Sequence, residues 1–325
     1  MDPREFCTQT RLVIVAGKGG VGKTTVAAAV ARMAAGQGLN VLIVEIEGKH
    51  GLAAAFGTPP LNYDDRILHL PDGDSRGTGT IRARSLSPDT ALLEYLDNQG
   101  LRKISRRLTR TGTVDVVATA APGIKDIVLL GKVKQLERQG GADLIVLDAP
   151  AAGHAVTFLQ SPRSLLDTVS GGPIRVQAED VLELLTDPTR SRVMPVTLPE
   201  ETPVNEVVET AFTLEDKVGI DLGPVVVNGV YPPVDGFDVD AEEAAAAAGI
   251  RLRPGEAQAL RDAARFRIAR HELQQEQLAR LADALPLPQL HMPMVFTAEV
   301  GPTEITTLAR ALESSVNALQ PVEHR

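Results

Sequence analysis

The chain has 325 residues, of which 42 are acidic and 33 are lysine or arginine, so its formal net charge is −9. With 43% hydrophobic and 23% charged residues it can bury a large core, and at about 150 residues per domain its length allows one large or two ordinary domains. The net negative charge argues against non-specific nucleic-acid binding, and the single cysteine, Cys7, excludes an internal disulfide and a multi-thiolate metal site built from one chain.

Hydropathy along the chain bears on its location. No apolar run approaches the roughly 18 residues that cross a bilayer, and the first ten residues lack the apolar segment of a signal peptide. We therefore expect a cytoplasmic protein with no integral membrane segment. The absence of tryptophan and the 3% aromatic content also disfavour base-stacking surfaces, so we expect no nucleic-acid partner.

Apolar runs of strand length alternate with helical stretches. Residues 12–16 form a continuous apolar run, typical of a strand buried on both faces, and an alanine-rich helix is expected over 23–35. Because strands that alternate with helices need crossover connections, this order predicts an α/β fold with a mostly parallel, doubly wound sheet. We expect about seven to eight strands, with helices on both faces. The other strand candidates are 41–46, 144–148, 193–197, 224–228 and 287–292.

Helices are predicted over most of the remaining chain. Those on either side of the strand at 144–148 interrupt the strand order, so we expect the regions 86–139 and 161–190 to form a helical layer beside the sheet. We interpret residues 1–325 as a single domain that includes this layer. The predicted helices are 88–96, 101–109, 122–138, 178–185, 203–218, 254–285 and 302–319.

Residues 17–24 read Gly-Lys-Gly-Gly-Val-Gly-Lys-Thr and fit the phosphate-loop pattern G-x-x-x-x-G-K-[ST]. The motif lies between a predicted strand and a predicted helix, which is the context it requires. Its glycines let backbone N–H groups approach phosphate oxygens, and the helix N-terminus adds positive potential. The sequence therefore predicts a P-loop fold that binds ATP and ADP. The predicted nucleotide contacts in the loop are Gly17, Lys18, Gly19, Gly20, Val21, Gly22, Lys23, Thr24 and Thr25.

Other polar groups complete the predicted site. Lys23 should neutralise the β- and γ-phosphates, while the Thr24 hydroxyl and Asp148, the Walker B acid at a strand end, should hold Mg²⁺. Residues 149–154 are small, which suits a loop that changes shape with the γ-phosphate, and Gly153 could offer its N–H to that phosphate. Asn228 ends a strand and is a candidate for reading the adenine edge.

The candidates for catalysis are Lys23 and two further residues, Lys18 and Glu47. A phosphate loop does not need Lys18, and K-G-G-x-G-K-T-T is the deviant Walker A signature of ATPases in which this lysine reaches the nucleotide of the facing subunit. The alternative is a solvated lysine on the loop. Glu47 follows the second predicted strand and could orient or deprotonate the attacking water. A structural carboxylate that contacts a loop amide is the alternative for Glu47.

The order of these blocks resembles a known family, the arsenite-pump and tail-anchored-protein targeting ATPases (ArsA/GET type), and the chain looks like a bacterial member. The resemblance implies a Mg-ATP-binding and hydrolysing enzyme whose dimer opens and closes with nucleotide and acts on a client or membrane partner. The dimer would be formed with a second copy or with a paralogue. Lys18 then resembles the trans-acting lysine and Asn228 the adenine-reading asparagine. The matching blocks are GKGGVGKTT at 17–25, VLIVEIEGKHGLAAAFG at 41–57, APGIKD at 121–126 and DLIVLDAPAAGHAVTFLQSP at 143–162.

The chain also departs from the family pattern. Its first switch has Glu47 where the family has an aspartate, and its second switch lacks both family threonines. One cysteine cannot form the thiol cluster that captures arsenite, and the C-x-x-C pair of the targeting branch is absent. The resemblance therefore predicts the ATPase but not its client.

Two other functions share the phosphate loop. A partitioning or septum-positioning ATPase would use the same loop, although it needs a basic face that the net charge disfavours. A weakly hydrolysing, nucleotide-binding regulatory subunit is compatible with Glu47 and the altered second switch. An electron-transfer relative needs cluster-bridging cysteines and is excluded.

Overall fold

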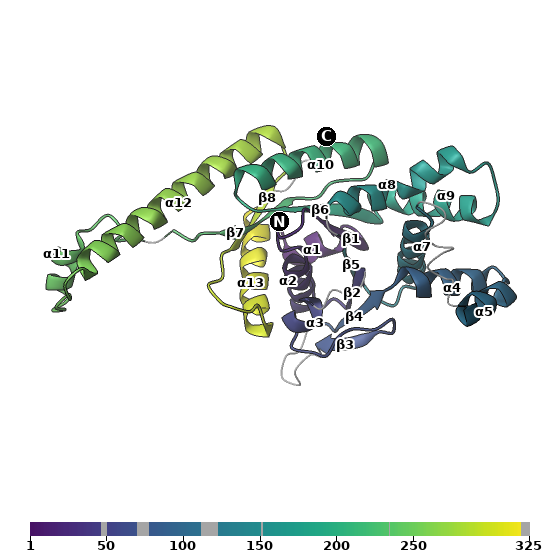
Figure 1. The fold of residues 1–325 in the computed structure, drawn as a ribbon, viewed down its shortest axis with the longest axis horizontal. Helices are drawn as coiled ribbons and strands as arrows, with labels where there is room; N and C mark the ends of the chain where they lie inside the picture. Colours follow the sequence, from purple (N-terminus) through teal and green to yellow (C-terminus); the bar gives the residue numbers. More distant parts are fainter. Residues whose placement is uncertain (47–50, 70–77, 112–122, 151, 234, 320–325) are drawn as a thin grey trace.

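The computed structural model describes residues 1–46, 51–69, 78–111, 123–150, 152–233 and 235–319. The described residues form an eight-stranded sheet with helices packed on both faces (Figure 1). In chain order its strands are β1 (Leu12–Ala16), β2 (Val41–Ile46), β3 (Arg66–His69), β4 (Ile81–Leu86), β5 (Leu144–Asp148), β6 (Ser191–Thr197), β7 (Val225–Val230) and β8 (Gln289–Pro293).

The strand order across the sheet is β3-β4-β2-β5-β1-β6-β7-β8. The edge strand β3 runs antiparallel to β4, and the other described neighbours pair in parallel. This confirms the predicted mostly parallel α/β sheet. It also puts β1, which leads into the phosphate loop, between β5 and β6, so the carboxyl ends of three central strands meet at that loop.

The helices complete a three-layered arrangement. The alternation of β1 defines its two faces: Val13 and Val15 pack on the side of the first long helix, whereas Leu12 and Ile14 face the helical layer. In chain order the described helices are α1 (Pro3–Thr8), α2 (Lys23–Gly36), α3 (Gly51–Ala55), α4 (Pro88–Asn98), α5 (Arg102–Thr111), α7 (Ile124–Gln139), α8 (Ala152–Thr168), α9 (Pro173–Thr186), α10 (Glu201–Val218), α11 (Ala241–Ala247), α12 (Glu256–Ala284) and α13 (Pro302–Ala318).

The two faces of the sheet carry different helices. Helices α2 and α13 cover one face, where Ile305, Leu308 and Leu312 of α13 are buried against the alanine-rich α2. Helices α4, α7, α8, α9 and α10 cover the other face (Figure 1). Ser87 caps α4, because the backbone N–H of Thr90 donates to its hydroxyl at 3.3 Å.

One local expectation needs correction. The segment 149–154 is not a loop throughout, because α8 begins at Ala152.

Helix α5 leaves apolar side chains uncovered: Leu101, which precedes it, and Ile104 are 41% and 49% exposed. A ten-residue helix with five basic side chains at the edge of the layer has few neighbours to cover it, whereas Ser105 is buried.

Helix α12 extends from the body of the molecule and carries α11 near its far end (Figure 1). Its C-terminal part is anchored by apolar packing, because Leu278 and Leu281 pack with Val204 and Val207 of α10. Over the described residues, no helix is both long enough and apolar enough to cross a membrane.

Candidate nucleotide-binding site

The phosphate loop connects β1 to α2, and three of its glycines are required by its backbone. Gly20 and Gly22 have φ of +87° and +88°, in the left-handed region that side chains disfavour. A Cβ on Gly17 would lie 2.4 Å from the carbonyl oxygen of Val196 in β6. The loop is therefore packed against the neighbouring strand and enters α2 through Gly22, its N-cap residue.

Asn228 of β7 contacts this loop. Its Nδ2 donates to the carbonyl oxygen of Val21 at 3.0 Å, and a Cβ on Gly22 would lie 2.3 Å from the same nitrogen. The asparagine thus supports the loop directly, a contact that sequence reasoning missed. Its expected reading of adenine stays a prediction.

Lys23 begins α2 and is only 6% exposed. Its ammonium donates to the backbone carbonyl of Lys18 at 2.9 Å, so the charge lies within the curve of its own loop. A buried ammonium needs polar partners, and incoming phosphate oxygens would offer it charged ones. Thr25 follows in the same helical turn and is half-buried.

Thr24 and Asp148 come together from α2 and β5. The Thr24 hydroxyl donates to Oδ2 of Asp148 at 2.7 Å. Asp148 is fully buried at the end of β5, where its register partners are Val15 of β1 and Glu45 of β2. A hydroxyl and a carboxylate oxygen side by side are the hard ligands that Mg²⁺ prefers, so this pair fits the predicted ion.

Glu45 is a buried carboxylate that sequence reasoning passed over. It lies beside Asp148 in the sheet and is 2% exposed. The signal was an acidic residue within the otherwise apolar run at 41–46. A buried acid beside Asp148 is a further candidate for a functional role, because acidic side chains are rarely fully buried unless they are paired.

Lys18 has a partner within its own chain. Its ammonium lies 3.0 Å from Oε1 of Glu206 in α10, and the lysine side chain is 43% exposed. The sequence analysis assigned Lys18 no role within its own subunit. In this structure Lys18 forms an ion pair with Glu206 of the same chain.

Two predicted site residues remain: Gly153 in the second switch and Glu47 in the first. Gly153 lies in the first turn of α8, where backbone N–H groups have no acceptor within the helix. That position is compatible with an N–H directed at a phosphate. Glu47 lies outside the described residues.

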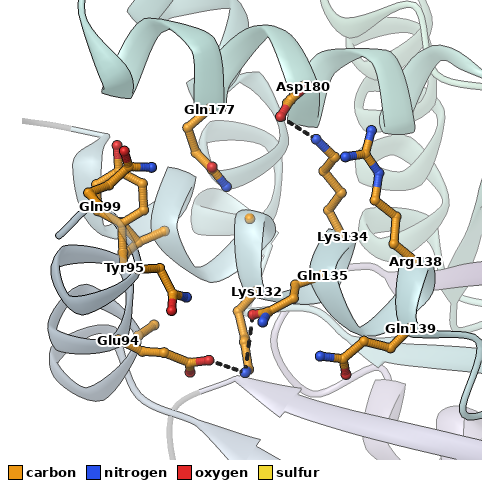
Figure 2. A pocket seen from close by; sticks show the side chains of 14 residues that line it. Glu94, Tyr95, Gln99, Lys132, Lys134, Gln135, Arg138, Gln139, Gln177 and Asp180 are labelled. Carbon is orange, nitrogen blue, oxygen red and sulfur yellow. Dashed lines mark hydrogen bonds and ion pairs between the residues drawn. The ribbon is translucent and has the colours of Figure 1, made fainter.

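A separate polar cavity of about 410 Å³ lies between α4, α7 and α9 (Figure 2). Figure 2 shows its two lysines directed at carboxylates: Lys132 pairs with Glu94 and Lys134 with Asp180, each at 2.5 Å. Both charges are therefore neutralised. None of the residues that line this cavity belongs to the phosphate loop, so the two features are separate.

A phosphate loop between β1 and α2, with an acid at the end of the adjacent strand, defines the chain as a P-loop nucleotide-binding protein. Residues 10–170 match the family described as anion-transporting ATPase, ArsA type. Together with the relatives below, this match shows that the chain belongs to the ArsA/GET-type ATPase family and is an ATPase.

Relatives extend the similarity across most of the chain. ATPase BagA of Mycobacterium tuberculosis is 35% identical over 311 residues, which cover 88% of this chain and 87% of BagA. The arsenical pump-driving ATPase of Acidiphilium multivorum is 27% identical over 261 residues, 74% of this chain and 42% of that protein. ATPase get3 of Schizosaccharomyces japonicus is 26% identical over 158 residues, 49% of this chain and 46% of its own.

Proposed function

We propose that this ATPase binds Mg²⁺-ATP in the loop 17–25 and hydrolyses it to ADP and phosphate. The observation that carries the proposal is the 2.7 Å contact between the Thr24 hydroxyl and Asp148, directly beside the phosphate loop. Bound Mg²⁺ would supply positive charge to the β- and γ-phosphates. Thr24 and Asp148 are the residues that would hold it, Asp148 directly or through water.

The chain's own groups supply the rest of the phosphate site. Lys23 exchanges the carbonyl of Lys18 for phosphate oxygens, and the backbone N–H groups of residues 19–25 point at the same anion. Gly153 donates its N–H to the γ-phosphate from the first turn of α8. Asn228 holds the loop and reads the adenine edge.

We further propose that the working unit is a dimer, with a second copy or with a paralogue. Lys18 then stabilises charge on the nucleotide of the facing subunit, and Glu47 orients the attacking water. Nucleotide-driven opening and closing would act on a client or membrane partner from the cytoplasm. The sheet and the helical layer act as one domain in this cycle. The arsenical pump-driving ATPase is, by its name, an ATPase that drives a pump, which supports action on a partner and does not identify the client here.

Calorimetric titration of ATP with Mg²⁺ tests the site. Lys23→Ala removes the main phosphate cation and should abolish measurable binding, whereas Lys217→Ala, an exposed lysine of α10, should leave affinity unchanged. Circular dichroism of both variants checks that the fold is intact. Undiminished affinity in folded Lys23→Ala would remove the loop from the nucleotide site.

A further inference from the structure

Large apolar side chains lie uncovered on the segment that projects from the body. We call the described residues of 231–273 the arm; they comprise the connection after β7, α11 and the first part of α12. Phe266 is 67% exposed, and Phe296, next to the arm, is 71% exposed. Large apolar patches are rare on monomeric surfaces unless something binds there. Other exposed apolar residues of the arm are Val239, Ile250, Leu260, Ile268 and Leu273.

An open cavity of about 840 Å³ lies between α11 and the first part of α12. Its walls are mostly apolar and include three phenylalanines as well as Ile250, Leu252 and Leu260. The alanines of α11 have short side chains and leave the space open. A volume of this size holds a complete ligand, and apolar walls with a few polar groups are typical of ligand sites.

One polar group at the edge of this cavity lacks a partner among the described residues. The guanidinium carbon of Arg267 lies 4.0 Å from the ring centroid of Tyr231 and 5.6 Å from that of Phe296. Its Nη2 donates to the carbonyl of Pro232 at 3.0 Å, but Nη1 is shielded from solvent and has no hydrogen-bond acceptor within the described part of the chain. A guanidinium N–H held by stacking is suited to a carboxylate or phosphate oxygen.

The lining of this cavity holds more positive than negative side chains, although the arm as a whole has six arginines and eight acidic residues. Arg261, Arg265 and Arg267 line it with Asp238 and Asp240, and Arg261 pairs with Asp240. The cavity therefore combines apolar walls with a guanidinium, that of Arg267, which forms no ion pair among the described residues. A ligand that matches both has an apolar body and an anionic head.

We propose that the arm binds an amphipathic anion, a long acyl chain with a carboxylate or phosphate head. The acyl chain lies in the cavity against Leu260 and the α11 alanines, where burial of its methylene groups favours binding. The head accepts a hydrogen bond from Nη1 of Arg267. This site is separate from the phosphate loop, and the proposal does not depend on the nucleotide cycle.

The first test uses oleate, a free carboxylate lipid, and the full-length protein. Oleate should displace a fluorescent anthroyloxy fatty acid from the protein. Methyl oleate, which lacks the charge, should bind at least about tenfold more weakly. Co-flotation of the protein with anionic phosphatidylglycerol vesicles tests whether it binds a phosphate head in a membrane. Phosphatidylcholine vesicles, which have no net charge, are the control. Oleate binding alone indicates a free lipid as the source, and vesicle binding alone indicates a membrane lipid.

Matched variants locate the site. Leu260→Glu places a charge in the cavity wall and should lower affinity at least tenfold, whereas Leu273→Glu, on the same helix but outside the lining, should have no effect. Arg267→Gln should lower affinity about tenfold, and Arg253→Gln, an exposed arginine outside the lining, should not. All four variants should keep the ATPase rate of the unaltered protein, which also reports folding.

Three outcomes would overturn the proposal. The first is that neither oleate nor anionic vesicles bind. The second is that neither Leu260→Glu nor Arg267→Gln lowers the affinity for the lipid. The third is that Leu260→Glu changes only the oligomeric state measured by light scattering, which would show that a second copy of the chain covers the arm.

Discussion

The ammonium of Lys18 lies 3.0 Å from the carboxylate of Glu206, although 188 residues separate them in the chain. Glu206 belongs to α10, and the phosphate loop lies within reach because β6, which precedes α10, is the direct neighbour of β1. An exposed ion pair of this kind is worth about 0.2–1 kcal/mol. If Lys18 acts on a facing subunit, it must first give up this partner.

Glu206→Gln should therefore increase ATP hydrolysis at protein concentrations where the dimer is incomplete. Loss of a competing pair worth up to about 1 kcal/mol corresponds to an increase of up to about fivefold. Hydrolysis measured against protein concentration, at low salt, checks this. Glu209→Gln, one turn along α10, is the control and should not change the rate. A lower rate for Glu206→Gln would instead show that Glu206 positions Lys18 for catalysis.

Lys18→Ala should bind nucleotide nearly as well as the unaltered chain and lose most of its hydrolysis. Lys23 remains in the loop to neutralise phosphate, whereas the charge supplied across the dimer is lost. Calorimetry and single-turnover hydrolysis separate these two effects. If hydrolysis per subunit is unchanged on dilution to monomeric protein, the dimer is not the working unit.

Asn228→Ala should weaken the binding of both ATP and GTP, and that of ATP more. Loss of the hydrogen bond to Val21 loosens the loop for any nucleotide, by about 0.5–1.5 kcal/mol, or about two- to tenfold. Loss of the adenine contact affects ATP alone. Competition binding of the two nucleotides measures the difference, and equal losses would limit Asn228 to supporting the loop.

Glu47→Gln should lower kcat and leave ATP affinity unchanged, because it keeps the size of the side chain and removes the charge. General-base assistance contributes typically about 10²–10⁴-fold in rate. Single-turnover hydrolysis at saturating Mg²⁺ is the measurement, with Glu47→Asp as the variant that restores the family residue. A rate within about twofold of the unaltered protein would favour a structural carboxylate and a weakly hydrolysing regulatory protein.

Cys7 should resist alkylation in the folded protein. Burial, reinforced by the charges of Asp2 and Glu313, raises the pKa of its thiol to about 12. Iodoacetamide at pH 8 should react about a hundredfold or more slowly than with urea-unfolded chain, since the thiolate is the nucleophile. Because the folded pKa is the higher one, this group stabilises the fold below about pH 9 and loses that contribution as the pH rises toward 12. Equal labelling rates would contradict the burial of Cys7.

The elements that sequence predicted best are those with an unbroken pattern. The apolar run at 12–16 and the helix at 254–285 reappear as β1 and α12 with shifts of at most two residues. Strand β4 was missed because Arg82 and Arg84 alternate with buried Ile81 and Ala83, and both arginines pair with Asp65. Such alternation is the pattern of a half-exposed strand near a sheet edge. The strand predictions rested on continuous apolar runs, which β4 does not have.

Helix α1 was missed although its signal was present. Asp2 caps it by accepting from the N–H of Glu5 at 2.9 Å, and Pro3 occupies the first turn. Six residues are too few to show helical periodicity. The local part of the candidate site, the loop and Thr24, followed from a contiguous motif. The contacts of Glu206 and Asn228 with the loop could not be predicted, because they depend on the order of β1, β6 and β7 across the sheet.

The path of β7 links two parts of the protein that the sequence keeps far apart. Asn228 donates a hydrogen bond to Val21 of the phosphate loop, and Tyr231, where the arm begins, follows three residues later in the chain. The hydrogen bond to Val21 and the three residues from Gly229 to Tyr231 therefore form a short covalent and hydrogen-bonded path between the phosphate loop and the start of the arm. The two regions are anchored on one strand of the sheet although they are far apart in the sequence.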